Sequence, residues 1–309
     1  MFLHHVEVMY VKQKNTNTSK IIDRGYNNSS KIFNFMISLV QTSQNRVKEL
    51  LRYVESLNDQ ENIDFSKIQL IFVDQGDCKK AFTNLNPQID FVYVKYKPSS
   101  LSHARNVGLK YVKGEYIAFP DDDCWYAKDT LSKVLIKLNS HDGVLIKATN
   151  EDGIPLANYL DYDKKATLFD HCSACSICIF LHYDESICYD ENIGVGSPYG
   201  LASGEETDYL IYFIKKHPDV VFFPGIEIHH PLGKTTFFKD DLDKAYKYAR
   251  GNGYLMKKHN YPFSLVLRAL IRPLGGIFIN LLKGNLLLSR RSFCLLKGRI
   301  EGLMYRLKS

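Results

Sequence analysis

Residues 101–126 read LSHARNVGLKYVKGEYIAFPDDDCWY, and this stretch decides the fold class. An apolar run at 116–119 leads through a proline into three aspartates, 121–123, which are followed closely by the only tryptophan, Trp125. Neighbouring like charges raise one another's pKa values, so a bound cation is the simplest explanation of the triplet. Mg²⁺ and Mn²⁺ prefer carboxylate oxygens, with the remaining positions filled by a substrate's phosphates. An acidic turn that caps the following helix is the structural alternative.

Strand and helix patterns alternate on both sides of this stretch. Strands are predicted at 33–40, 68–73, 91–96, 115–119 and 144–148, and helices at 46–57, 101–112, 130–138 and 205–216. The run at 68–73 is apolar almost throughout, as expected of a strand buried on both faces. The alternation predicts an α/β fold with a mostly parallel, Rossmann-like sheet flanked by helices. Ligands bind at the carboxyl ends of the strands in such sheets, which is where the aspartates lie.

Charge divides the chain into two unlike parts. Residues 1–243 contain 26 Lys and Arg against 33 Asp and Glu, a net charge of −7, whereas residues 244–309 contain 14 basic residues and one acid, a net charge of +13. We therefore predict three segments: a polar N-terminal lead-in at 1–30, a catalytic domain at 31–243, and a basic, apolar helical tail at 244–309.

The basic tail has the pattern of amphipathic helices. Residues 263–282 read FSLVLRALIRPLGGIFINLL, in which Arg268 and Arg272 interrupt a nearly membrane-spanning apolar run. An arginine near the centre of a span costs about 2.5 to 3.5 kcal/mol on insertion scales, so interfacial residence is favoured over spanning. The hypothesis is that the tail lies on an anionic membrane surface. Helices that pack on the domain with solvated basic faces are the alternative, and nucleic-acid binding is disfavoured because no recognisable module accompanies the charge.

The N-terminus and the cysteines indicate a cytoplasmic protein. No basic segment followed by a long apolar core is visible at 1–30, so no cleavable signal peptide is predicted. The seven cysteines are therefore expected to be reduced thiols. Three of them form a C-x2-C-x2-C run at 172–178, but this run lies in a strand-like apolar stretch, where a free cysteine behaves as a small hydrophobic residue rather than a metal ligand.

Four motifs in a set order resemble a known enzyme family. They are SLVQTSQNRVKELLRYVESL at 38–57, LIFVDQGD at 70–77, the stretch that ends in the three aspartates, and GEETDYL at 204–210. Together they resemble the inverting glycosyltransferases of family 2, which have the GT-A nucleotide-sugar-binding fold. The resemblance extends over about residues 33–231. It implies a metal-dependent transfer of a sugar from a nucleotide-diphosphate donor, with a UDP-sugar expected.

The resemblance also implies roles for particular residues in the donor site. Gln41 and Thr42 would contact the nucleoside, Asp74 its base or ribose, Arg105 the nucleotide, Asp123 the metal directly, and Asp121 the ribose or the metal. Arginine suits a diphosphate because its planar donors pair with phosphate oxygens. The alternative for Arg105 is a helix-surface arginine paired with an acid. Gln75 stands where family members often have a second aspartate, which leaves the base open.

Inverting transfer needs a base that takes the proton of the acceptor hydroxyl. Glu206 stands where the family usually has the aspartate of its Glu-Asp pair and is the candidate base, with Glu205 and Asp208 as alternatives. A structural explanation is also open, because Ser203-x-x-Glu206 is a capping-box pattern at a helix start.

Two further groups of residues are candidates for the site. His229 and His230 resemble a histidine that GT-A enzymes often add to the metal or diphosphate, and a neutral imidazole suits Mn²⁺. Trp125 and Tyr126 offer flat faces on which an acceptor sugar could pack. Structural histidines and ordinary core aromatics are the respective alternatives.

The sequence therefore predicts a glycosyltransferase that uses Mn²⁺ or Mg²⁺. The expected acceptor is a saccharide or lipid-linked saccharide of surface polysaccharide synthesis, and the enzyme is expected to be peripheral on the inner face of the cell membrane. Two alternatives remain: a noncatalytic membrane-associated assembly partner, and a sugar nucleotidyltransferase. The second normally has a glycine-rich phosphate loop after the first strand, whereas residues 41–46 contain no glycine.

Overall fold

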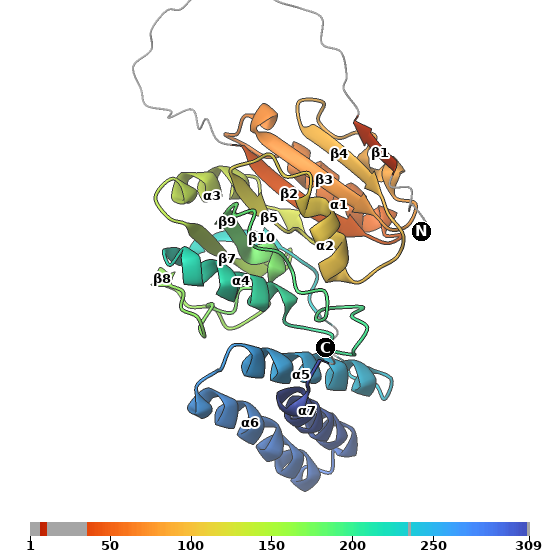
Figure 1. Cartoon of the computed structure of the whole chain (residues 1–309), viewed down its shortest axis with the longest axis vertical. Coiled ribbons are helices and arrows are strands. Elements are labelled where there is room, and N and C mark those ends of the chain that lie inside the picture. The colour runs from red at the N-terminus through yellow and green to blue at the C-terminus, as the bar shows by residue number, and fades with distance from the viewer. Residues whose placement is uncertain (1–6, 11–35, 234–235, 308–309) are drawn as a thin grey trace, which may run out of the picture.

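The computed structural model describes residues 7–10, 36–233 and 236–307. Figure 1 shows a sheet flanked by helices, with the C-terminal helices grouped below it. The strands are β1 (Glu7–Tyr10), β2 (Ile37–Ser43), β3 (Ile68–Asp74), β4 (Asp90–Lys95), β5 (Tyr116–Ala118), β6 (Trp125–Tyr126), β7 (Gly143–Thr149), β8 (Lys164–Lys165), β9 (Ile179–His182) and β10 (Val220–His229). The helices are α1 (Val47–Asn58), α2 (Leu101–Leu109), α3 (Thr130–Leu138), α4 (Glu205–Lys216), α5 (Asp241–Lys258), α6 (Phe263–Leu282) and α7 (Leu286–Met304), with 3-10 turns at Phe65–Lys67, Lys79–Phe82 and Ser176–Cys178.

The strands form one mixed sheet in the order β1-β4-β3-β2-β5-β9-β7-β10-β6, with β8 paired to β10. Strands β4, β3, β2 and β5 are mutually parallel, as are β7 and β10. Strand β9 lies antiparallel between β5 and β7. Because β2, β3 and β5 run in the same direction, their carboxyl ends meet at one edge, and the segments that follow them lie side by side.

The core has one layer on each face of the sheet. On one face, Leu39 and Leu70 pack with residues of α1 and α3, such as Leu50 and Leu131. On the other face, alternate strand residues pack with α2 and α4 through side chains that include Val40, Ile71, Ala104 and Leu210. Near-continuous apolar strands are required because both faces are covered. The predicted fold class is confirmed.

Most predicted elements are present with ends shifted by a few residues. The predicted strand at 33–40 is observed as β2, and its residues 33–35 lie outside the described part of the chain. The stretch at 171–181 is only partly a strand, because a 3-10 turn precedes β9. Of the polar lead-in at 1–30, the structure describes Glu7–Tyr10, which form a strand paired with β4. The remainder of that prediction lies outside the described residues.

The tail is a group of three helices attached to the sheet domain through α5. Helices α5 and α7 are in near-backbone contact, because a Cβ atom added at Gly298 or Gly302 would lie 2.5 or 2.1 Å from a carbonyl oxygen of α5. Helix α6 packs on α7, where Ser289 donates a hydrogen bond to the carbonyl of Ile277. The three tail helices therefore pack on one another. The outer face of α6 remains exposed.

Candidate active site

The three aspartates follow β5 and lie beside the carboxyl end of β2. The middle one, Asp122, accepts hydrogen bonds from Ser43 at the end of β2 (2.6 Å) and from Arg46 (2.8 Å). Burial raises the pKa of Asp122 to about 6, although both of these contacts oppose the rise. Asp122 therefore fixes the triplet to β2 and to the start of α1. The sequence motif gave this residue no role.

Asp123 pairs with a histidine from the loop that follows the last long strand, β10. The Nε2 atom of His230 lies 3.1 Å from Asp123 Oδ1, and Arg46 donates to the other oxygen at 3.0 Å. Burial alone would raise the pKa of Asp123, but His230 and Arg46 together lower it to about 2. His229 points elsewhere: its Nδ1 atom lies 3.0 Å from Thr149 Oγ1, and its ring packs against Trp125. Of the two candidate histidines, the structure brings only His230 to the aspartates.

Arg105 is a buried residue of α2 with 2% exposure, so the helix-surface interpretation is wrong. It donates to Asp121 Oδ1 at 3.0 Å and to the Ser176 hydroxyl at 2.6 Å. Its second terminal nitrogen is buried without a partner among the described residues. Burial raises the pKa of Asp121, although the charge of Arg105 opposes the rise. The pair places an unsatisfied cationic nitrogen close to the aspartates.

The other predicted donor residues lie at the ends of β2 and β3. Gln41 is fully buried, donates to the Asp121 carbonyl at 3.4 Å, and has a side-chain oxygen without a partner among the described residues. Thr42 follows it and is half-buried. Asp74 is fully buried and accepts hydrogen bonds from the backbone N–H groups of Gly76 and Cys78 and from the Tyr93 hydroxyl. It thus shapes the turn after β3, and its contact with a nucleotide stays a prediction.

The acidic segment at the start of α4 contains carboxylates with different environments. Glu205 is 5% exposed, and one of its oxygens has no partner among the described residues. Burial, and then the neighbouring Glu206, raise the pKa of Glu205 to about 8. Glu206 is half-buried. At neutral pH Glu205 is thus mainly protonated, and the more exposed Glu206 stays the candidate base.

Asp208 faces α5 instead. It accepts hydrogen bonds from His259 at 2.7 Å and Lys258 at 2.9 Å, and Lys258 also pairs with Asp190. The Asp208 side chain is 1% exposed. These contacts give it a structural role, which is to hold the tail against α4.

The capping box predicted at 203–206 does not form. Gly204 is the residue that caps α4, with a φ of 97°, and no side chain caps the helix. The Ser203 hydroxyl instead donates to the carbonyl of Tyr248 in α5, at 2.7 Å. Glu206 is therefore not explained by helix capping.

Trp125 and Tyr126, the two aromatic residues after the aspartates, lie in different places: Tyr126 is in the core and Trp125 is at the edge of the site. Tyr126 is 4% exposed and packs against Tyr53 in the core, so the prediction that it receives an acceptor sugar is wrong. Its burial follows from β6, because neighbouring strand residues point to opposite faces. Trp125 is half-buried, with the Arg52 guanidinium 3.6 Å above its ring. That face of the indole is already covered.

The side chains at the aspartates suit an open metal site and not a closed one. Among the described residues, no three His, Cys, Asp or Glu side chains form a metal-binding group. The Asp123 carboxylate and the His230 imidazole lie in contact, and Asp121 stands in the same segment as Asp123, after β5. A site with few protein ligands fits Mg²⁺ or Mn²⁺, which share their remaining positions between water and substrate phosphates.

Comparison with known proteins relates part of the chain to one family. Residues 38–163 match the family described as glycosyl transferase family 2. This stretch is thus similar to glycosyltransferase family 2 domains. It is 30% identical over 189 residues to the minor teichoic acid biosynthesis protein GgaB of Bacillus subtilis (strain 168), a match that covers 54% of this chain and 21% of that protein. The chain thus spans about a fifth of the length of this relative.

Solved structures show the same GT-A fold at low sequence identity. S. aureus TarS residues 1–349 match with a TM-score of 0.53 and 17% identity, over 72% of this chain and 65% of that one. The mannosyltransferase PcManGT from Pyrobaculum calidifontis, solved with GDP-Man and Mn²⁺, matches with a TM-score of 0.58 and 12% identity over 88% of both chains. A further structure of TarS 1–349 contains UDP and matches with a TM-score of 0.51 and 16% identity, over 85% of this chain and 89% of that one.

Proposed function

We propose that this protein is an inverting glycosyltransferase that moves a sugar from a nucleotide-diphosphate donor, with a UDP-sugar expected, to a saccharide or lipid-linked saccharide. The main supporting observation is the convergence of Asp121, Asp123, Arg105 and His230 at the carboxyl ends of β2 and β5. Open α/β sheets bind their ligands at this edge. The UDP in the TarS structure and the GDP-Man in the PcManGT structure support a nucleotide-sugar donor, and the polymer named for GgaB supports a role in teichoic acid or other surface polysaccharide synthesis.

Asp123 and His230, with Asp121, would hold a divalent ion. The ion would offset the negative charge that develops on the departing nucleotide diphosphate. The unsatisfied nitrogen of Arg105 is a second source of positive charge, and its position is fixed by bonds to Asp121 and Ser176. A preorganised cation of this kind stabilises a developing anion without rearrangement of the protein.

Glu206 would act as the base that takes the proton of the acceptor hydroxyl. The protonated Glu205 beside it adds no second negative charge at neutral pH, which favours approach of the acceptor. A thermal-shift series with UDP-, GDP- and dTDP-sugars, each with and without Mn²⁺, tests the donor directly, because a ligand that binds the native state raises the melting temperature. No shift with any nucleotide sugar would contradict the proposal.

Glu205→Gln should distinguish the role of Glu205 from that of Glu206. The folded-state pKa of Glu205 lies above its ordinary value, so its contribution to stability is present below about pH 4.5 and is lost as the pH rises through 8. The variant is therefore expected to gain stability over wild type between pH 5 and pH 8, by about 1 to 3 kcal/mol at pH 8. Its turnover at pH 7 should stay within about tenfold of wild type. An unchanged pH profile of melting would contradict the assigned protonation state.

Asp208→Ala is expected to destabilise the fold by about 1 to 3 kcal/mol, because it removes the hydrogen-bond partner of the buried His259 and leaves Lys258 with Asp190 as its remaining carboxylate. Urea unfolding measures this effect. Asp243→Ala is the matched control, since its pair with Lys247 is exposed and should contribute under about 1 kcal/mol. Donor turnover per folded molecule should persist in Asp208→Ala. Lost turnover with unchanged stability would instead make Asp208 the base.

The protein is proposed to act at the inner face of the cell membrane. The outer face of α6 presents apolar side chains at helical spacing, from Phe263 through Leu267, Ile271, Leu274 and Phe278 to Leu282. By length and composition, α6 is the one described helix that could cross a membrane. It is nevertheless packed on α7 and bears two arginines, so we propose that it lies in the membrane plane, with the basic tail facing anionic headgroups.

Replacing Ile271 and Phe278 together by glutamate is expected to reduce binding to anionic vesicles at least about tenfold in a flotation assay. These side chains are 54% and 60% exposed, so the changes should not disturb the core. Ile136→Glu is a matched control, because Ile136 on α3 is 53% exposed. Point changes are better than removal of the tail, which would uncover buried charges on α4. Equal binding of the double variant and the control would refute the α6 surface.

A further inference from the structure

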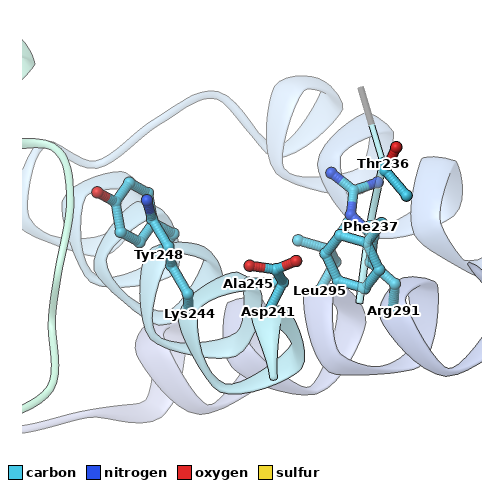
Figure 2. Close-up of a pocket in the computed structure, with 8 residues that line it drawn as sticks. All are labelled: Thr236, Phe237, Asp241, Lys244, Ala245, Tyr248, Arg291 and Leu295. Atoms are coloured by element: carbon cyan, nitrogen blue, oxygen red, sulfur yellow. The ribbon is translucent and has the colours of Figure 1, made fainter. Parts of the chain in front are cut away.

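A groove of about 340 Å³ lies where α5, α7 and the segment before α5 meet. Figure 2 shows Lys244 and Tyr248 projecting from α5, with Arg291 of α7 beside Phe237. The groove thus combines two cations with two aromatic rings. We call it the tail groove.

The cations of the tail groove have no carboxylate partner among the described residues. Lys244 contacts the Tyr248 ring, 5.3 Å from its centroid, and the Arg291 guanidinium lies 5.1 Å from the Phe237 ring. One carboxylate, Asp241, also lines the groove, but it accepts a hydrogen bond from the backbone N–H of Phe238 and so closes the turn at the start of α5. The groove therefore has an excess of positive charge, which favours an anionic ligand.

The tail groove adjoins the segment that leads into the candidate base. Ser203 donates to the Tyr248 carbonyl at 2.7 Å, the Ala202 N–H donates to the Lys247 carbonyl, and Arg250 donates to the Tyr199 carbonyl. Close contact is enforced at Gly251, where a Cβ atom would lie 2.5 Å from the Ser203 carbonyl oxygen. Ser203 stands three residues before Glu206. Residues 247–251 of α5 are thus fixed against the segment that leads into α4.

The pKa of Tyr248 also indicates that this residue of α5 lies near the acidic residues of the site. Burial, and then the charges of Glu205, Glu206 and Asp121, raise the pKa of the Tyr248 phenol. Tyr248 is 36% exposed, so its ring is accessible to a ligand, in contrast to Tyr126. An exposed aromatic face beside the carboxylates is the surface on which a sugar ring packs well.

We propose that the tail groove is an acceptor subsite for a chain of sugar or polyol units that bears phosphate groups. The acceptor unit next to the reacting hydroxyl packs on Tyr248, and phosphates of the chain contact Lys244 and Arg291, which lie on the two sides of Asp241 in Figure 2. Phosphate suits these side chains because lysine supplies a point charge and arginine a planar pair of donors. This inference rests on the proposed transferase function and assigns its acceptor a chemical class.

The test measures binding of a synthetic oligo(glycerol phosphate) by calorimetry, with a neutral oligosaccharide of similar length as the comparison probe. Wild type should bind the phosphate probe more tightly, and added salt should weaken this binding. Lys244→Gln and Arg291→Gln should each weaken it about tenfold, as expected for loss of one charge-assisted contact. Lys247→Gln and Arg290→Gln, which alter neighbouring cations that do not line the groove, should have little effect. UDP affinity should be unchanged in all four variants.

Two outcomes would overturn the proposal. One is equal affinity of wild type, Lys244→Gln and Arg291→Gln for the phosphate probe, including no binding by any of them. The other is binding of the two variants to the probe as in wild type while they lose binding to phosphatidylglycerol vesicles, which would assign both cations to the membrane. Failure of the transferase function itself would appear separately, as a lack of UDP-sugar binding by wild type.

Discussion

Glu206→Gln is expected to reduce sugar transfer by about 10² to 10⁴-fold, the usual contribution of a general base. The amide keeps the size of the side chain and cannot accept the proton of the acceptor hydroxyl. Donor affinity should not change, because Glu206 belongs to α4 and not to the strand ends that form the donor edge. Single-turnover transfer from a radiolabelled nucleotide sugar, together with calorimetry of UDP, measures the two effects separately.

Glu205→Gln is the matched control for this prediction. It makes the same chemical change one residue away, at a carboxyl group that is already mainly protonated at neutral pH. Near-normal transfer by Glu206→Gln would eliminate Glu206 as the base, and a larger loss in Glu205→Gln would move the base to Glu205.

Removal of divalent ions is expected to lower donor turnover by at least about a hundredfold, since electrostatic stabilisation of a leaving group is commonly the greatest single contribution to catalysis. Slow hydrolysis of the donor without acceptor is the simplest assay. Turnover should stop after chelation and return with Mn²⁺ or Mg²⁺ and not with Na⁺ at equal ionic strength. Full turnover in chelator would leave Arg105 as the cation that acts on the diphosphate and would exclude a metal role.

The sequence predicted the fold well because its signals are local. The buried strands β2, β3 and β7 are short apolar runs, and α1 presents its apolar residues on one helical face, as period and length require. The acidic triplet was placed correctly at a strand end, since a strand followed by charged residues indicates the rim of a parallel sheet.

Features that depend on distant contacts could not be predicted. His229 and His230 are equivalent in sequence, and the end of β10 separates them: His229 is the last strand residue and contacts Thr149, whereas His230 follows the strand and meets Asp123. From sequence alone, Asp208 is a reasonable candidate base. Its partners lie about 50 residues away, at the end of α5, and only the fold shows that they bind it. Tyr248 was missed because nothing near it in sequence indicates that α5 packs beside the start of α4. An exposed tyrosine in a basic helix has no recognisable motif.

The central claim is that the acidic triplet holds a divalent ion, which in turn holds the diphosphate of the donor. The most direct test is calorimetry of UDP binding at several Mn²⁺ concentrations, with wild type and with Asp121→Ala/Asp123→Ala. The account predicts that wild-type affinity rises with Mn²⁺ and that the double variant loses both this dependence and at least about tenfold of its affinity. Equal affinities, with the same response to Mn²⁺ in both proteins, would contradict it.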